Sequence, residues 1–247
     1  MITHTEAVVF RSVDYSESSK IVTFFSREHG KIAVMAKGAK RPKSKFSGLI
    51  ETGNILDVVY YFKSSRSVQI LSKAAYAEKT MNLRTDFEKM ATMTSAIELI
   101  RQLLHENEVN KPLFDFTKKV LLWLNEAKIH PPLVFPYLQI RLANLMGINL
   151  QAKNKADANS SNYLNLKSGY ISRESEPSHS YKLTPNQFNF ISLALHSKSS
   201  ALFDIPFEKG ELKALIKNLD LYLKYHVEGL RDRKSDAIFE QILQGNP

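Results

Sequence analysis

The sequence predicts a multi-domain α+β protein in which a small β-barrel is followed by a bundle of helices. Two observations carry this prediction. The first eighty residues are a succession of short segments rich in β-branched and aromatic side chains, with turn residues between them. After residue 80 the apolar residues recur about every three and a half positions instead of every second one, which is typical of amphipathic helices. We therefore expect one domain over residues 1–80 and a second over residues 81–247.

The N-terminal segments are short and numerous enough for a closed barrel. Five strands are expected, at residues 7–13, 20–27, 31–37, 54–62 and 68–74. Glu28, His29 and Gly30 separate the second strand from the third, and the glycine supplies the positive φ that a tight hairpin needs. Five short strands fit the OB fold, a five-stranded barrel that often binds oligonucleotides. The prediction for residues 1–80 is therefore an OB-like, nucleic-acid-binding domain.

The remaining chain is expected to be helical, with helix ends marked by capping residues. Residues 85–88 (TDFE) have the pattern of a capping box at the start of a first helix, and Pro112 begins a second. A third helix covers residues 133–146 and stops at Gly147, and a good N-cap, Thr184, precedes a proline at the start of the fourth. The last three helices are expected at about residues 185–196, 208–228 and 234–243.

Residues 149–183 interrupt the helices with a polar stretch that has almost no helical periodicity. One hairpin is expected in it, with strands at residues 163–166 and 170–172 around the turn at residues 167–169. A loop of this length inside a compact domain is either functional or the remnant of a small module.

Positive charge is concentrated in the N-terminal part of the chain. Of the net charge of +9, residues 1–80 contribute +6, from thirteen Lys or Arg against seven Asp or Glu. Such a clustered field attracts a polyanion, either nucleic acid or an acidic surface. Residues 31–45 hold six cations and no acid: Lys31, Lys37, Lys40, Arg41, Lys43 and Lys45. We expect these side chains to contact DNA phosphates, with an affinity that falls steeply as salt rises.

Aromatic side chains near these cations are candidates for base stacking, because proteins usually grip single strands with aromatic rings beside cations. Phe46 lies in a polar loop directly after the last cation and is the preferred stacking residue. Phe24 or Phe25, Tyr60, Tyr61 and Phe62 either stack on bases or fill the barrel. The barrel interior is the favoured place for these strand residues, because a small barrel must be filled by its own side chains.

No catalytic or metal-binding arrangement stands out. The seven histidines are scattered without the H-E-x-x-H spacing, and the absence of cysteine excludes disulfides and thiolate zinc sites. Residues 38–44 (GAKRPKS) lack the second glycine of a phosphate-binding loop. There is no apolar run near the roughly 20 residues that cross a membrane, and no signal-peptide pattern. We expect a cytoplasmic, nucleoid-associated protein that is not an enzyme and needs no cofactor.

The N-terminal motifs resemble the RecO family of bacterial DNA repair proteins. The resemblance lies in residues 14–17 (DYSE) after the first strand, residues 26–31 (SREHGK) at the first hairpin, and residues 36–41 (AKGAKR) followed by Ser44. It is dense over about residues 5–80. Weaker similarity continues at residues 137–147, 223–229 and 234–235.

The resemblance implies an OB barrel followed by a helical bundle, and a recombination mediator that binds single- and double-stranded DNA. Such a protein anneals complementary single strands and, with RecR, helps load RecA onto DNA coated by single-strand-binding protein. Many RecO proteins carry a four-cysteine zinc site after the glycine that is Gly147 here. Because residues 149–183 contain no cysteine, we expect a degenerate, zinc-finger-like insertion without zinc.

The family also binds the acidic, apolar C-terminal tail of single-strand-binding protein in its helical domain. Such a tail needs an apolar pocket rimmed by a cation. Arg141, inside an otherwise apolar helix, is the candidate for this contact. The alternative is that Arg141 is an ordinary exposed helix residue.

Two other functional classes remain open. A generic OB-fold binding protein that associates with RNA or the ribosome fits the composition equally, although the order of the motifs favours DNA repair. The relative affinities for single-stranded DNA and RNA separate these two classes. The third class is an enzyme whose site the sequence does not reveal, and a metal or nucleotide that co-purifies with the protein would point to it.

Overall fold

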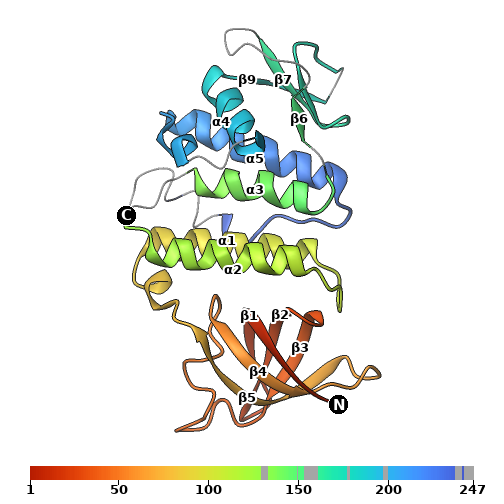
Figure 1. Cartoon of the computed structure of the whole chain (residues 1–247), viewed down its shortest axis with the longest axis vertical. Coiled ribbons are helices and arrows are strands. Elements are labelled where there is room, and N and C mark those ends of the chain that lie inside the picture. The colour runs from red at the N-terminus through yellow and green to blue at the C-terminus, as the bar shows by residue number, and fades with distance from the viewer. Residues whose placement is uncertain are drawn as a thin grey trace. The chain divides into compact units, whose positions relative to one another are not determined.

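The computed structural model describes residues 1–128, 133–148, 150–152, 161–176, 179–196, 200–236 and 241. The chain divides into two compact units, Met1–Lys128 and Ile129–Pro247 (Figure 1). The boundary expected from the sequence, after residue 80, separates the barrel from the rest of the chain. The boundary between the compact units falls later in the chain, after Lys128, because the first two helices pack on the barrel.

The first unit begins with five strands that form a closed barrel in the order β1-β2-β3-β5-β4. They are β1 (Ile2–Tyr15), β2 (Ser19–Ser26), β3 (Gly30–Ala36), β4 (Ile55–Tyr61) and β5 (Val68–Glu78). The pair β3 and β5 is parallel, and the other neighbours are antiparallel. The long strand β1 pairs with β4 and with β2, and its register shifts between Val9 and Arg11. The predicted five-stranded, OB-like barrel followed by helices is thereby confirmed.

Alternation along the strands places one face of each in the barrel core, as in β3, where every second residue is buried. Phe24 and Tyr60 are fully buried and belong to the barrel core. Phe25 is also fully buried, but on the other face of β2, where its ring lies 5.4 Å from that of Phe114. Tyr61 points the other way and is 47% exposed. Phe62 is partly buried against the core and stacks on the His29 ring, with 4.3 Å between the ring centroids.

Two helices complete the first unit, α1 (Phe87–Leu103) and α2 (Lys111–Glu126), after a short 3-10 turn, η1 (Met81–Arg84). The expected capping box at Thr85 is wrong by one residue. Asp86 is the N-cap, and its carboxylate accepts a hydrogen bond of 3.0 Å from the backbone N–H of Lys89. The expected start of α2 near Pro112 is confirmed, since Pro112 lies in the first turn behind the N-cap Asn110.

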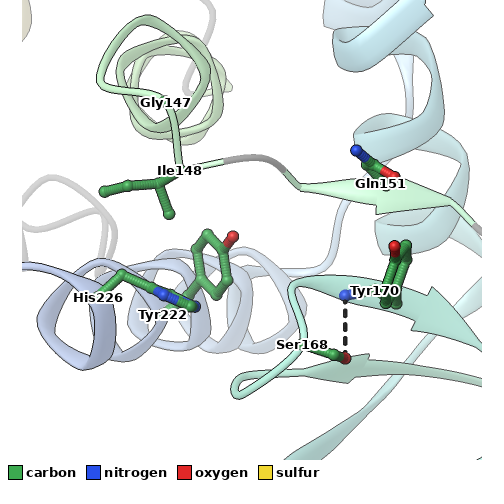
Figure 2. Close-up of a pocket in the computed structure, with 7 residues that line it drawn as sticks. All are labelled: Gly147, Ile148, Gln151, Ser168, Tyr170, Tyr222 and His226. Atoms are coloured by element: carbon green, nitrogen blue, oxygen red, sulfur yellow. Dashed lines mark hydrogen bonds between the residues drawn. The ribbon is translucent and has the colours of Figure 1, made fainter.

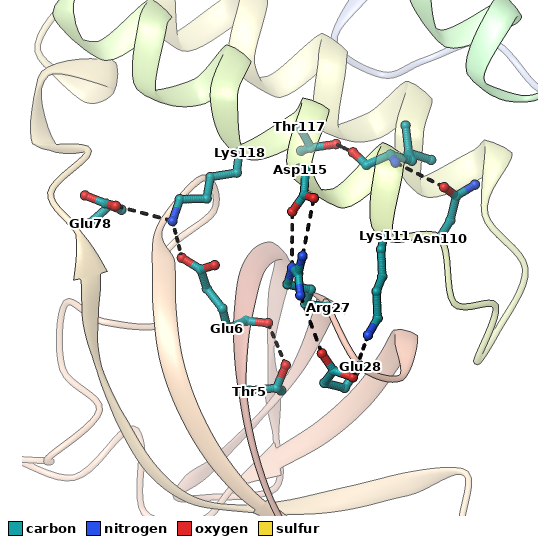
Figure 3. A network of polar contacts seen from close by, with 11 residues as sticks. Thr5, Glu6, Arg27, Glu28, Glu78, Asn110, Lys111, Asp115, Thr117 and Lys118 are labelled. Carbon is teal, nitrogen blue, oxygen red and sulfur yellow. Dashed lines mark hydrogen bonds and ion pairs between the residues drawn. The ribbon is translucent and has the colours of Figure 1, made fainter.

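Ion pairs connect α2 to the barrel (Figure 3), and so does an aromatic contact between Phe114 and Phe25. Arg27 lies 3.1 Å from Asp115, and Lys111 lies 3.0 Å from Glu28. Lys118 contacts two barrel carboxylates, Glu6 at 2.5 Å and Glu78 at 3.3 Å. Burial opposes the charged form of Lys118, but the bonds to both glutamates outweigh it and raise the pKa of the ammonium. The turn between β2 and β3 is thus the end of this hairpin that faces α2.

The second unit combines helices with a small sheet. Its described elements are α3 (Val134–Leu145), β6 (Gln151–Ala152), β7 (Asn162–Asn165), β8 (Tyr170–Ser172), β9 (Ser180–Leu183), α4 (Pro185–His196), η2 (Ser200–Asp204) and α5 (Lys209–His226). The sheet has the order β6-β8-β7-β9. The expected hairpin is confirmed, because Tyr163 pairs with Ser172 and Leu164 with Ile171. The sequence did not predict β6 and β9.

The expected helices of this unit are present where the structure describes them. Gly147, with a φ of +76°, follows α3, and the Thr184 hydroxyl accepts a 3.3 Å bond from the N–H of Gln187 at the start of α4. The helix expected at residues 234–243 lies mostly outside the described residues, as do residues 149, 153–160 and 177–178 of the polar stretch.

Candidate nucleic-acid interface

The loop between β3 and β4, residues 37–54, is fixed from its inner side. Phe46 and Ile50 are 1% and 2% exposed and belong to the barrel core. The side-chain amide of Asn54 donates to the carbonyl of Gly48 at 3.0 Å, and the Tyr76 hydroxyl donates to the same oxygen at 2.9 Å. The buried rings and these bonds hold the loop against the barrel, so its polar residues are left on the outside.

We call residues 37–45 the basic loop. Five cations of this loop are exposed: Lys37, Lys40, Arg41, Lys43 and Lys45. Among the described residues, the side chains of Lys37, Arg41 and Lys43 have no hydrogen bond or ion pair. These three cations are therefore available to phosphates, whose neutralisation releases counterions.

The other two cations of the basic loop have partners within the protein. Lys40 lies 3.0 Å from a carboxylate oxygen of Asp14, and its backbone N–H bonds the carbonyl of Ser18 at 3.0 Å. The hydrogen bond from Lys40, assisted by nearby positive charge, lowers the pKa of the Asp14 carboxyl. Lys45 donates to the carbonyl of Ser72 on β5 at 2.7 Å. The basic loop is thus joined to the turn after β1 and to the middle of β5.

Two residues expected to contact DNA lie in other surroundings. The Lys31 ammonium bonds the carbonyls of Arg101 and Leu104 at the end of α1 and lies 3.2 Å from Glu106, with its side chain only 13% exposed. The Lys31 ammonium thus bonds carbonyl groups at the C-terminal end of α1 instead of facing solvent. The buried ring of Phe46 has no face to offer to a base. The candidate interface therefore excludes both residues.

The outer side of the barrel carries a row of apolar side chains, which we call the outer row: Ile2, Ile21, Met35, Tyr61 and Ile70. They are neighbours across the strands, because Met35 pairs with Ile21 and Ile70, and Tyr61 pairs with Ile70 and Ile2. Directly paired residues project from the same face of a sheet. Ile2 is 66% exposed and Tyr61 is 47% exposed. Tyr61 therefore offers the stacking face that Phe46 lacks.

The basic loop and a second group of cations flank the outer row. Lys37 follows β3 two residues after Met35, and the partner of Lys45, Ser72, lies two residues after Ile70 on β5. On the other side, the turn between β4 and β5 carries two exposed cations, Lys63 and Arg66. The sequence points to Tyr61 but not to the row, because its members are adjacent only across the strands. Pairing the outward positions of the five predicted strands is the signal that could have found it.

Arg141 lies on α3 in the second unit and is partly buried. Its Nε atom is buried and has no hydrogen-bond partner among the described residues. A buried donor without a partner is costly, so this position favours an acceptor. Arg141 is therefore not an ordinary exposed helix residue.

The described residues contain no group of three His, Asp or Glu that could hold a metal ion. Within the same residues, no helix is both long and apolar enough to span a membrane.

The fold and the exposed cations define the chain as an OB-fold protein with a helical second part. The family "Recombination protein O N terminal" matches residues 1–79, and "Recombination protein O C terminal" matches residues 84–236. The chain belongs to the RecO family of DNA repair proteins.

Several curated relatives carry the name DNA repair protein RecO. The protein of Chlorobium limicola is 28% identical over 259 residues, which cover 98% of this chain and 99% of that protein. The protein of Chloroherpeton thalassium is 25% identical over 98% of this chain and 100% of its own length. The match to the protein of Salinibacter ruber is 39% identical but covers 60% of this chain and 56% of that protein.

Proposed function

We propose that this chain binds single-stranded DNA across the outer row of the barrel, on β1 to β5, and anneals complementary strands as a recombination mediator. The observation that carries the proposal is a group of three exposed cations, Lys37, Arg41 and Lys43, which have no side-chain partner among the described residues. They belong to the loop that begins two residues after Met35 of the outer row. Cations beside surfaces on which bases stack are the usual means of holding a single strand. Membership of a DNA repair family supports DNA as the ligand rather than RNA.

The two kinds of side chain have separate roles in this proposal. The cations of the basic loop neutralise successive phosphates, with Lys40 and Lys45 contributing less because each already has a partner in the protein. Tyr61 stacks on a base, and Met35 and Ile70 offer apolar surface to its neighbours. In this arrangement the DNA strand lies with its phosphates at the basic loop and its bases on the outer row.

Annealing follows from binding and charge neutralisation, without any change in covalent bonds. Two complementary strands repel each other through their phosphates, and cations that neutralise one strand lower this repulsion. Base pairing then drives the reaction. We accordingly propose that the protein is not an enzyme and that it also binds the double-stranded product through the same cations.

We propose that residues 1–80 are the nucleic-acid-binding domain and that residues 81–247 are the helical domain. Within the first compact unit, α2 then supports the barrel, because its ion pairs reach the turn between β2 and β3 and leave the basic loop at the opposite end of this hairpin. Bound DNA at the basic loop therefore does not compete with α2 for the barrel.

The partners that we propose are RecR, with which the protein helps load RecA, and the acidic C-terminal tail of single-strand-binding protein. The buried Nε atom of Arg141 without an acceptor supports a contact with a carboxylate of that tail. An Arg141→Ala variant is expected to bind the tail peptide at least about tenfold more weakly, since losing a charged hydrogen bond costs about 1.5–3 kcal/mol. Unchanged affinity in calorimetry would remove Arg141 from this role.

The experiment that tests the proposal is annealing of complementary oligonucleotides, bare and coated with single-strand-binding protein. The variant is Lys37→Ala/Arg41→Ala/Lys43→Ala. The matched control is Lys209→Ala/Lys213→Ala/Lys217→Ala, which removes the same charge from exposed positions of α5. We expect the wild type and the control to anneal and the basic-loop variant to be impaired.

Two results would contradict the proposal. A wild-type protein that binds DNA but never accelerates annealing is a single-strand binder and not a mediator. Tighter binding to RNA than to DNA of the same sequence would favour the alternative, a generic OB-fold protein that associates with RNA or the ribosome.

A further inference from the structure

A cavity of about 360 Å³ lies in the second unit, where the residues after α3, strand β6, the turn between β7 and β8 and the end of α5 meet (Figure 2). Pockets for small ligands occupy roughly 300–1,000 Å³, so this volume suits a single ring system. The helices around it are joined by side chains, because the Gln139 amide on α3 donates to the carbonyl of Ile216 and to Asp220, both on α5. The walls of the cavity are therefore held in place without a ligand.

Tyr222 is the buried polar group that faces this cavity. The residue is 1% exposed, and Figure 2 shows its hydroxyl directed into the space between Ile148 on one side and Gln151 and Tyr170 on the other. The Tyr222 hydroxyl has no hydrogen bond to any described residue. Burial raises the pKa of this phenol to about 12, so the group stays neutral and can both donate and accept. The hydroxyl opens onto the cavity, where it is free to bond a ligand atom.

The other polar groups of the cavity are also of the kind that both donate and accept. The Gln151 amide and the Ser168 hydroxyl lie on its rim, and His226 already uses its Nε2 atom in a 2.8 Å contact with the carbonyl of Leu166. Among the described residues, no Lys, Arg, Asp or Glu lines the cavity. Ile148 and the ring of Tyr170 add flat or apolar surface. This lining suits a planar, neutral ligand whose edge carries both donors and acceptors.

We propose that this cavity binds one unpaired nucleobase, with its edge on Tyr222 and Gln151 and its ring against Tyr170. Unpaired bases have this chemistry, since proteins recognise them by stacking and by hydrogen bonds to the exposed edge. The choice of a base among neutral ligands rests on the proposed function. The presence of the cavity and its lining do not depend on that function. An acidic peptide fits this lining poorly, because no Lys or Arg of the described part of the chain faces the interior.

The test uses nucleosides, which carry no phosphate and therefore do not depend on the basic loop. The full chain is labelled with 3-fluorotyrosine, and the ¹⁹F resonance of Tyr222 is assigned as the one of the ten tyrosine signals that disappears in Tyr222→Phe. Deoxyadenosine and deoxycytidine are then added. We expect the Tyr222 resonance to shift in a saturable way, and the same shift in the Lys37→Ala/Arg41→Ala/Lys43→Ala variant.

Two variants measure the hydrogen bonds, with nucleoside affinity followed by calorimetry. Tyr222→Phe and Gln151→Leu are each expected to weaken nucleoside binding about fivefold, the effect of losing one net hydrogen bond. The matched control is Tyr225→Phe on the same helix, which removes a hydroxyl from a 46% exposed ring outside the lining and should leave the affinity unchanged.

Several outcomes would overturn the inference. One is a Tyr222 resonance that does not move up to the solubility limit of both nucleosides. Another is a resonance that moves with an acidic peptide instead. Salt-dependent binding of an oligonucleotide, measured on the same sample, reports on the barrel alone, so failure of this inference and failure of the proposed function are distinguishable.

Discussion

Replacing Lys118 with methionine is expected to destabilise the first unit more than breaking any other ion pair between α2 and the barrel. The Lys118 ammonium lies between Glu6 and Glu78, and the three side chains are 25%, 21% and 41% exposed. Methionine keeps the length of the side chain but leaves two carboxylates facing each other without a cation.

The magnitude follows from the exposure of the three groups. Exposed ion pairs contribute at most about 1 kcal/mol, whereas breaking a buried pair costs about 3–5 kcal/mol. This partly buried site lies between these limits, so we expect the free energy of unfolding to fall by about 2 kcal/mol. For a unit of this size the loss corresponds to a decrease in Tm of roughly 6–10 °C.

Differential scanning calorimetry at neutral pH measures this change, and Lys111→Met is the matched control on the same helix. Lys111 pairs with Glu28 at 3.0 Å, but both side chains are nearly half exposed, at 46% and 43%. We therefore expect the control to lose less than about 0.5 kcal/mol. Equal losses in the two variants would refute the argument that burial sets the strength of these pairs.

Three further predictions concern the barrel. Asp14→Asn releases Lys40, so single-stranded DNA should bind more tightly and with a salt slope steeper by about 0.7 in fluorescence anisotropy; an unchanged slope would contradict the pairing. Tyr61→Ala should weaken this binding roughly tenfold at unchanged stability, whereas Phe46→Ala should cost about 3–5 kcal/mol of stability; the reverse pattern would return Phe46 to the DNA surface. Burial lowers the pKa of His29 below 6.5, so below that pH the unfolded chain binds more protons than the folded one. The stability of the wild type should therefore fall as the pH decreases through this range. Between pH 7.5 and 5.5 the urea midpoint of His29→Phe should decrease less than that of the wild type.

The barrel could be predicted from the sequence because each strand carries its own signal. Alternating β-branched and aromatic residues mark all five strands, and Gly30 marks the first hairpin. Helix ends were predicted to within about two residues for the same reason, although the carboxylate of Asp86 and not the hydroxyl of Thr85 caps α1. In the second unit, β6 and β9 have only two and four residues and gain their pairing from distant segments.

The candidate site was only partly predictable, because residues that are adjacent in the sequence do not always lie in the same surroundings in the fold. Phe46 stands among polar residues in the sequence, yet its ring is buried in the barrel core. Lys31 belongs to the same run of cations as Lys37, but it lies near the opposite end of β3, where the carbonyls of α1 surround it. Tertiary contacts of this kind leave no local pattern in the sequence. The cations of the basic loop, by contrast, could be predicted from the density of Lys and Arg alone.

The most direct test of the account is a salt titration of single-stranded DNA binding by the wild type and the Lys37→Ala/Arg41→Ala/Lys43→Ala variant. Each phosphate contact contributes about 0.7 to the slope of log K against log salt, so removing three contacts should reduce the slope by about 2 units. The α5 variant with the same loss of charge should keep the wild-type slope. If the basic-loop variant also keeps that slope, the basic loop is not where this protein holds DNA.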